Sequence, residues 1–317
     1  MTSALIRSSK NVVVLDGGTG TSLANLGHSV EDLTWCSGLI ETHPHHVKQV
    51  HKDFFIAGAD VVCTSTYQAF VDGFVKQFGV SEQEALDLIK RGVKLAKEAR
   101  DEAELETGRH GFVAASVGAY GATLCDKSEY SGVYVDKLSR EELYEWHLPR
   151  MRVLCAAGPD ILACETIPAV EEALALVRCL ETLKTHAWIT FSLRDAKSTC
   201  HGEDIRVALA AVVSSPYVVA VGANCFSLTL VDDFLRYVKD LPLFDKPLII
   251  KPNAEKSEHD RSLSEQKLHE RVLDWVDAGA SWIGGCCKTD STDIASVRDQ
   301  LAKASHICFK KNGEALF

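Results

Sequence analysis

Short apolar runs rich in β-branched residues alternate with stretches of helical periodicity along most of the 317-residue chain. The same strand-then-helix unit is found eight times, which is typical of parallel βαβ construction. Most of the apolar runs contain few polar residues, as expected for strands that are covered on both faces. We expect strands at 12–16, 61–66, 112–117, 161–165, 187–193, 218–225, 247–252 and 281–286.

Helices are expected between these strands, and several of their ends carry recognisable signals. Ser81 with Glu84, and Ser139 with Glu142, have the spacing of capping boxes at helix starts, and Gly58 is placed for a left-handed C-cap. The predicted helices cover 45–57, 82–106, 140–157, 170–184, 205–214, 231–240, 264–278 and 292–303.

Eight strands alternating with eight helices predict an α/β protein with a (β/α)8 TIM barrel. We expect one domain over 1–317, with the barrel at about 11–303 and a short tail at 304–317. The competing fold is a doubly wound open sheet, but no strand is followed by a G-x-G-x-x-G turn. Long insertions at 21–42 and 120–139 follow strands, so they belong to the face where barrel enzymes keep their active sites.

Charge and hydropathy exclude two classes of partner. The chain has 34 Lys plus Arg against 44 Asp plus Glu, a formal net charge of −10, and no basic block, so nucleic acid is not expected. Its longest apolar run, 207–213, is far shorter than the roughly 18 residues of a membrane span. The first ten residues, MTSALIRSSK, lack an apolar signal-peptide core, so we expect a cytoplasmic protein.

The eleven cysteines are expected to be reduced thiols, because the count is odd and a chain of this length does not need disulfides for its core. Three of them, Cys225, Cys286 and Cys287, come from the ends of strands six and eight, whose tips approach each other in a closed barrel. Three thiolates and one open position make a plausible catalytic zinc site.

Adjacent strand residues point to opposite faces, so Cys286 and Cys287 can bind one ion only if the chain kinks. Gly284 and Gly285 supply the backbone freedom for that bend. The alternative is that one of the two cysteines is simply a buried residue of the core and binds no metal. Spacing alone does not separate these two interpretations.

Two acidic residues also end predicted strands. Asp16 precedes a turn containing Gly17 and Gly18, whose backbone N–H groups are suited to a carboxylate or phosphate, although a simple tight turn would look the same. Glu165 ends an apolar strand, where a carboxylate is either solvated at the rim or paired with a cation such as a substrate ammonium.

The histidines are expected to contribute less. His43, His45 and His46 crowd a helix start beside a proline and are interpreted as surface residues. His201 and His259 lie in predicted βα loops and can approach the site, but a single loop histidine is more often plain surface.

Taken together, several motifs resemble the homocysteine S-methyltransferase family, and the resemblance runs from about residue 11 to residue 303. Asn-Cys in one strand with Gly-Gly-Cys-Cys in another is the most specific combination. The motifs are DGGTG at 16–20, YQA at 67–69, CETIP at 164–168, GANC at 222–225 and GGCC at 284–287.

The resemblance implies a Zn2+-dependent barrel in which the three cysteines hold the metal and the homocysteine sulfur takes the open site. It further implies homocysteine contacts and a methyl-donor side, with no catalytic residue beyond the metal site. Glu165 is expected at the homocysteine amino group with Asp16 nearby, and backbone around Gly17 and Gly18 at the carboxylate. The donor side is expected at Trp35, Tyr67, Gln68 and Asn224, where an aromatic face can contact a cation.

The implied reaction is methyl transfer from a cationic donor to the homocysteine thiol, giving methionine. A free thiol has a pKa of about 8.5, and zinc removes its proton. Betaine-using members resemble this chain but carry a long C-terminal extension that these residues do not show. A sulfonium donor is therefore favoured, S-methylmethionine first and S-adenosylmethionine second.

Two alternatives stay open at the level of sequence. The three cysteines could form a structural or storage zinc site in a barrel without methyltransferase activity, although structural sites usually have four protein ligands. A thiol-redox role for Cys286 and Cys287 is less favoured, because the pair lacks the C-x-x-C setting at a helix start. No oligomeric state follows from the pattern.

Overall fold

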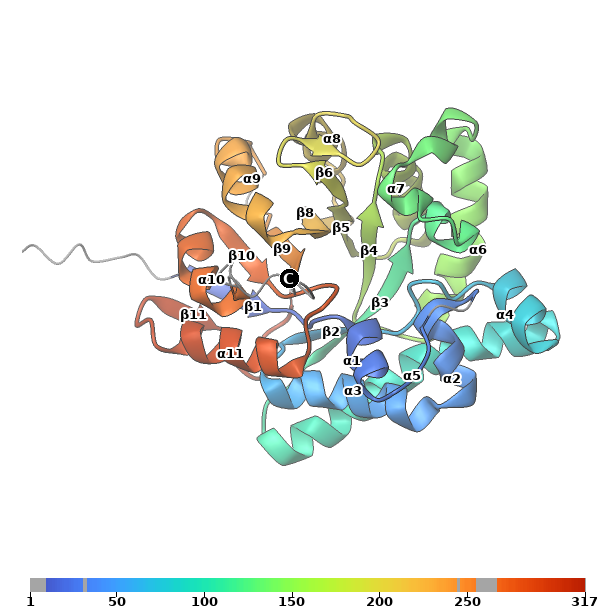
Figure 1. The fold of residues 1–317 in the computed structure, drawn as a ribbon, viewed down its shortest axis with the longest axis horizontal. Helices are drawn as coiled ribbons and strands as arrows, with labels where there is room; N and C mark the ends of the chain where they lie inside the picture. The colour runs from blue at the N-terminus through green and yellow to red at the C-terminus, as the bar shows by residue number, and fades with distance from the viewer. Residues whose placement is uncertain (1–9, 31–32, 244–245, 255–266, 317) are drawn as a thin grey trace, which may run out of the picture.

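The computed structural model describes residues 10–30, 33–243, 246–254 and 267–316. Within these residues nine strands form one sheet in the order β11-β1-β10-β9-β8-β5-β4-β3-β2. An additional parallel bridge between Leu15 and Val61 joins β1 to β2 and closes the sheet into a barrel, with the helices outside it (Figure 1). The strands are β1 Lys10–Val14, β2 Val61–Cys63, β3 Phe112–Gly118, β4 Ile161–Ile167, β5 Ala187–Phe191, β8 Val218–Ser227, β9 Leu248–Asn253, β10 Ala280–Ile283 and β11 Ile307–Phe309.

The predicted α/β barrel is confirmed, and each of the eight predicted strands corresponds to one barrel strand. The predicted helices also form, and both capping boxes and the left-handed Gly58, with φ 111°, are present. The first residues of the helix predicted at 264–278 lie outside the described residues. The eight helices are α3 Pro44–Ala57, α5 Glu82–Thr107, α6 Arg140–Ala156, α7 Val170–Leu183, α8 Ile205–Val213, α9 Val231–Val238, α10 Leu268–Asp277 and α11 Ser291–Ala302.

Apolar side chains pack on both faces of the barrel strands. In β1, Val12 and Val14 belong to the cluster between sheet and helices, whereas Val13 belongs to the cluster inside the barrel. The inner cluster contains Trp188 and Trp282, whose rings meet edge to face at 5.8 Å. Burial on both faces explains why the strands are near-continuous apolar runs. In the described residues, no helix combines the length and the apolar character that crossing a membrane requires.

The loops that follow the strands contain short elements that the periodicity did not predict. The first long insertion folds into α1 Thr19–Asn25, the 3-10 helix η1 Trp35–Gly38 and α2 Leu39–Thr42, and the second into the 3-10 helices η2 Tyr120–Leu124, η3 Ser128–Tyr130 and η4 Val133–Asp136. Helix α4 Val71–Phe78 follows β2, and a small antiparallel pair, β6 Leu193–Asp195 and β7 Ser198–Thr199, follows β5. These segments build the walls of the cavity described below.

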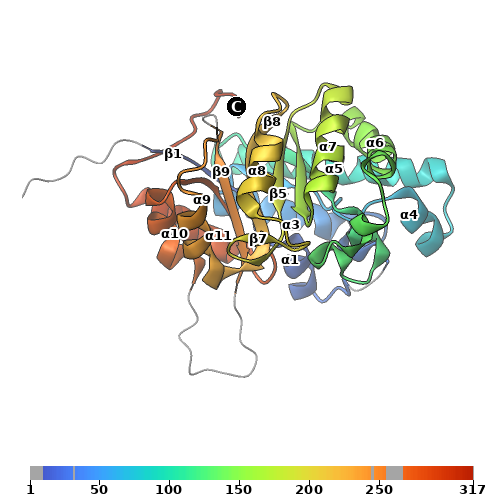
Figure 2. The same cartoon turned by 90° about the horizontal axis from the view of Figure 1, so that it is seen from above.

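The segment predicted as a C-terminal tail contains the strand β11, which pairs in parallel with β1. Beyond it, Leu316 is 7% exposed and packs in the cluster inside the barrel with Val13 and Leu15. In Figure 2 the segment after α11 runs along the side of the molecule opposite α1. The chain therefore covers the end of the barrel that lies away from the βα loops.

Candidate active site

A cavity of about 620 Å³ opens at the ends of the barrel strands, where the βα loops begin. Every residue that the sequence predicted for the site lines this cavity except Asp16, which lies beneath it. The predicted residues along the cavity are Gly17, Gly18, Trp35, Tyr67, Gln68, Glu165, Asn224, Cys225, Cys286 and Cys287.

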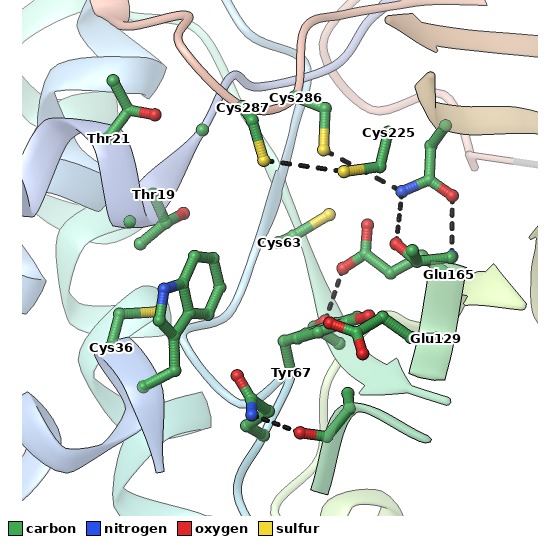
Figure 3. Close-up of a pocket in the computed structure, with 18 of the residues that line it drawn as sticks. Thr19, Thr21, Cys36, Cys63, Tyr67, Glu129, Glu165, Cys225, Cys286 and Cys287 are labelled. Atoms are coloured by element: carbon green, nitrogen blue, oxygen red, sulfur yellow. Dashed lines mark hydrogen bonds between the residues drawn. The ribbon is translucent and has the colours of Figure 1, made fainter. Parts of the chain in front are cut away.

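The three predicted cysteines converge on one point of the cavity wall (Figure 3). Cys225 is in the left-handed region with φ 56°, and the pairing of β8 with β9 is irregular between Asn224 and Ser227. Strand β10 ends at Ile283, so Cys286 and Cys287 lie in the following turn and not in the strand predicted to run to 286. The expected kink before the cysteine pair is therefore present.

The donor set fits a zinc ion. The sulfur atoms of Cys225, Cys286 and Cys287 all lie within 4.8 Å of one another, and those of Cys225 and Cys287 are 3.5 Å apart. Tetrahedral zinc with bonds of about 2.3 Å places its sulfur ligands about 3.8 Å apart. A hydrogen bond with Cys225 raises the pKa of the Cys286 thiol well above its usual value, and burial adds to the effect, whereas a bound cation would favour the ionised thiol.

One side chain at this cluster was missed by the sequence analysis. The Tyr130 hydroxyl lies 3.0 Å from the sulfur of Cys225. Tyr130 comes from the long loop between β3 and α6, where no periodicity or spacing marks one residue over another. Among the described residues, the three cysteines form the only group of three or more His, Cys, Asp or Glu side chains that could hold one metal ion.

Lys251 forms the centre of a buried charged group at the wall of the cavity. Its Nζ donates to Asp16 Oδ1 at 2.7 Å and lies 3.9 Å from Glu165 Oε2, and its side chain is 4% exposed. The other Asp16 oxygen, Oδ2, accepts the backbone N–H of Cys63 at 2.6 Å. Lys251 was also missed, although a lysine inside the apolar strand predicted at 247–252 was a usable signal.

Glu165 presents a carboxylate to the cavity from the end of β4 (Figure 3). Ser116 donates a hydrogen bond to its Oε1. Burial raises the pKa of Glu165, and the positive charge of Lys251 opposes that rise. The next residue, Thr166, has a left-handed φ of 61°, and the β4–β5 pairing is irregular between Cys164 and Ile167. The strand is thus distorted at the position where its acidic side chain faces the cavity.

The glycine turn after β1 is held against the cysteine turn. The backbone N–H of Gly18 donates to both the carbonyl and the hydroxyl of Thr289, each at 3.1 Å. A Cβ on Gly18 would lie 2.5 Å from the carbonyl oxygen of Cys286, so only glycine fits this approach. The turn therefore positions the cysteine cluster, and its role in carboxylate binding stays a prediction.

The residues predicted for the donor side form an aromatic wall of two rings, next to two amide side chains that are held by hydrogen bonds. The rings of Trp35 and Tyr67 meet edge to face with centroids 6.0 Å apart. Gln68 donates its side-chain amide to the carbonyl of Ala122. The Asn224 carbonyl accepts from the Thr166 backbone N–H and the Thr190 hydroxyl, both at 2.7 Å, and its amide donates to the Thr166 hydroxyl at 2.8 Å.

The described histidines lie apart from the cavity lining. His43, His45 and His46 form a group with His28, in which His28 Nε2 and His46 Nδ1 are 2.6 Å apart. His201 contacts Asp136 and Glu203, and His259 lies outside the described residues. None of the described histidines is part of the cysteine cluster.

Comparison with known proteins identifies the family. The homocysteine S-methyltransferase family profile matches residues 13–301. The chain is 39% identical to homocysteine S-methyltransferase 1 of Zea mays, over 92% of this chain and 95% of the relative, and 37% identical to homocysteine S-methyltransferase YbgG of Bacillus subtilis, over 90% and 93%. The metallated crystal structure of the homocysteine methyltransferase MmuM from Escherichia coli matches with a TM-score of 0.82 and 35% identity, over 91% of this chain and 96% of that one. The chain belongs to the homocysteine S-methyltransferase family.

Proposed function

We propose that this protein transfers a methyl group from a sulfonium donor to the sulfur of L-homocysteine, with zinc as cofactor, giving methionine. The observation that carries the proposal is the convergence of three cysteine sulfurs within 4.8 Å in a cavity that also contains a buried carboxylate, Glu165. A thiol substrate needs ionisation, and its amino group needs a counter-charge.

Cys225, Cys286 and Cys287 would hold the metal. When bound, zinc would supply a site at which a substrate thiol is ionised at neutral pH. The Gly18–Thr289 hydrogen bonds fix the turn that carries Cys286 and Cys287, and the Asn224 contacts fix the strand end that carries Cys225. The chain therefore holds the three sulfurs in place from both sides.

In this proposal Glu165 binds the homocysteine ammonium, and the backbone around Gly17 and Gly18 receives the carboxylate. Asp16 does not bind the substrate directly in this proposal, because its two oxygens accept hydrogen bonds from Lys251 and from the backbone N–H of Cys63. Lys251 neutralises Asp16 and leaves the Glu165 carboxylate, 3.9 Å away, able to accept a second cation. Selection of an amino acid thiol follows from this charge arrangement.

The methyl donor would enter on the side of Trp35, Tyr67, Gln68 and Asn224, where aromatic faces can contact its positive charge. The homocysteine sulfur attacks the methyl carbon while the bond from that carbon to the donor sulfur breaks. The donor sulfur keeps the electron pair and leaves as a neutral thioether. Positive charge is lost at the donor, so the exclusion of water by the aromatic wall favours the step.

The proposed donors are S-methylmethionine first and S-adenosylmethionine second, and the proposed partners are these small molecules alone. The proposed compartment is the cytoplasm. All eleven cysteines are unpaired thiols in the structure, which is typical of a reducing compartment.

The first test is methionine formation from homocysteine by purified, zinc-loaded protein with S-methylmethionine, S-adenosylmethionine or betaine. We expect turnover with a sulfonium donor, and we expect Cys286→Ala to lose both the bound zinc and at least a hundredfold of the activity. Cys308→Ala is the matched control, because Cys308 is exposed and lies outside the cluster. Stoichiometric zinc without turnover on any donor would contradict the proposal and favour a structural or storage site.

A further inference from the structure

Glu129 presents an unpaired carboxylate oxygen to the cavity. It lies in η3, Ser128–Tyr130, and lines the cavity next to Tyr130, whose hydroxyl contacts Cys225. The Oε2 atom of Glu129 is buried and has no hydrogen-bond partner in the part of the chain that the structure describes. An ionised carboxylate oxygen in such a position is costly unless a cation or a donor group is supplied from outside the protein.

The surroundings of Glu129 are aromatic and lie on the proposed donor side. Figure 3 shows its carboxylate beside the Tyr67 ring. Burial raises the pKa of the Tyr67 phenol, and the charge of Glu129 adds to that effect. The Tyr67 hydroxyl is itself buried and unpaired among the described residues. The backbone carbonyl of Glu129 accepts the Ser192 hydroxyl at 3.1 Å, which ties the loop to the segment after β5. The loop is thus held in position, while the Oε2 atom of the carboxylate has no partner among the described residues.

The chemistry of this subsite matches the headgroup of an amino acid. Lys127 also lines the cavity, is exposed, and interacts electrostatically with Glu129. A carboxylate with a lysine on the same rim suits a group that carries an ammonium and a carboxylate on one carbon. Burial raises the pKa of Glu129, and a bound ammonium would oppose that effect.

We propose that Glu129 is the specificity-determining residue for the methyl donor and binds its α-ammonium group, so that the enzyme selects sulfonium compounds with an amino acid headgroup. This inference rests on the proposed function. Glu165 serves the acceptor in that function, and it lines the same cavity beside Ser116 and Lys251. The two carboxylates would then separate two amino acid substrates that both carry an ammonium.

The test compares two sulfonium donors in the zinc-loaded enzyme and in Glu129→Gln. S-methyl-L-methionine has the α-ammonium, and dimethylsulfoniopropionate has the sulfonium and a carboxylate but no amino group. Loss of a charge-assisted hydrogen bond should raise the KM for S-methylmethionine about tenfold to a hundredfold in Glu129→Gln. The KM for homocysteine and the zinc content should change less than twofold. If the wild type turns over dimethylsulfoniopropionate, its kcat/KM in Glu129→Gln should stay within twofold of the wild-type value. If it is not turned over, its inhibition constant against S-methylmethionine should stay within twofold instead.

Asp126→Asn is the matched control, because it removes the same charge from an exposed position of the same loop and keeps an acceptor for the Ser128 N–H. We expect wild-type values for this variant. An unchanged KM for S-methylmethionine in Glu129→Gln, an equal loss for both donors, or an equal effect of Asp126→Asn would overturn the inference. Absence of turnover in the wild type would instead refute the proposed function, so the two failures are distinguishable.

Discussion

Lys251 and Asp16 form an ion pair whose side chains are 4% and 1% exposed. Removing one partner of such a pair leaves an uncompensated buried charge, so we expect Lys251→Met to lower the free energy of unfolding by about 3 kcal/mol. The double variant Asp16→Asn, Lys251→Met should lose less, because no unpaired carboxylate remains at position 16. Urea unfolding at pH 7 measures both values. A double variant less stable than Lys251→Met would show that the lysine supports the barrel by packing and not by charge.

At the level of single residues, strand ends were the informative positions in the sequence. Cys225, Cys286, Cys287 and Glu165 could be found because a closed parallel barrel brings its strand ends to one rim. Glu129, Tyr130 and Lys251 could not be assigned in the same way. The first two come from an irregular loop. A lysine inside an apolar strand marks an unusual position in the sequence, but its partner, Asp16, is identified only by the structure.

Helix α3 contains a buried histidine that ties stability to pH. Burial lowers the pKa of His51 to about 4, and both its ring nitrogens lack partners among the described residues. Above about pH 6.5 the side chain is neutral in both states, but below it the unfolded chain takes up a proton that the folded one does not. Its contribution to stability is therefore lost as the pH falls from about 6.5 to 4, by about 2 kcal/mol at pH 5.

We expect His51→Phe to reduce the loss of unfolding free energy between pH 7 and pH 5 by that amount, as measured from urea midpoints at the two pH values. His269→Gln, which removes a partly exposed histidine from α10, is the control and should keep the wild-type difference. If His51→Phe loses as much stability as the wild type on acidification, another buried group is responsible.

Among elements, length decided what the sequence could predict. Helices such as α5, 26 residues long, show several turns of periodicity and a capping box. Helices α1, α2 and α4 have 7, 4 and 8 residues, too few for a periodic signal to stand out from loop sequence. The strand β11 has three residues, and its existence depends on pairing with β1, which local sequence does not reveal.

For the whole molecule, the C-terminal segment closes the barrel end opposite the active site. Leu316 fills part of the inner apolar cluster, so Leu316→Ala should lower the free energy of unfolding by about 2 kcal/mol through the cavity it leaves. Thermal or urea unfolding measures the change. Leu105→Ala is the matched control, because Leu105 is 88% exposed and its loss should have almost no effect. Equal stability of the two variants would show that the segment does not contribute to the barrel.

The pairing of β1 has a consequence for how the protein is made. Lys10, Asn11 and Val12 pair with Ile307, Cys308 and Phe309, and Val13 and Val14 pair with Trp282 and Ile283. On the ribosome the first strand emerges long before these partners have been translated. Apart from the bridge between Leu15 and Val61, the strand therefore stays unpaired in the nascent chain, where its edges are open to other chains. This apolar strand is thus among the last to be completed, and it stays open to aggregation until residues 307–309 have been made.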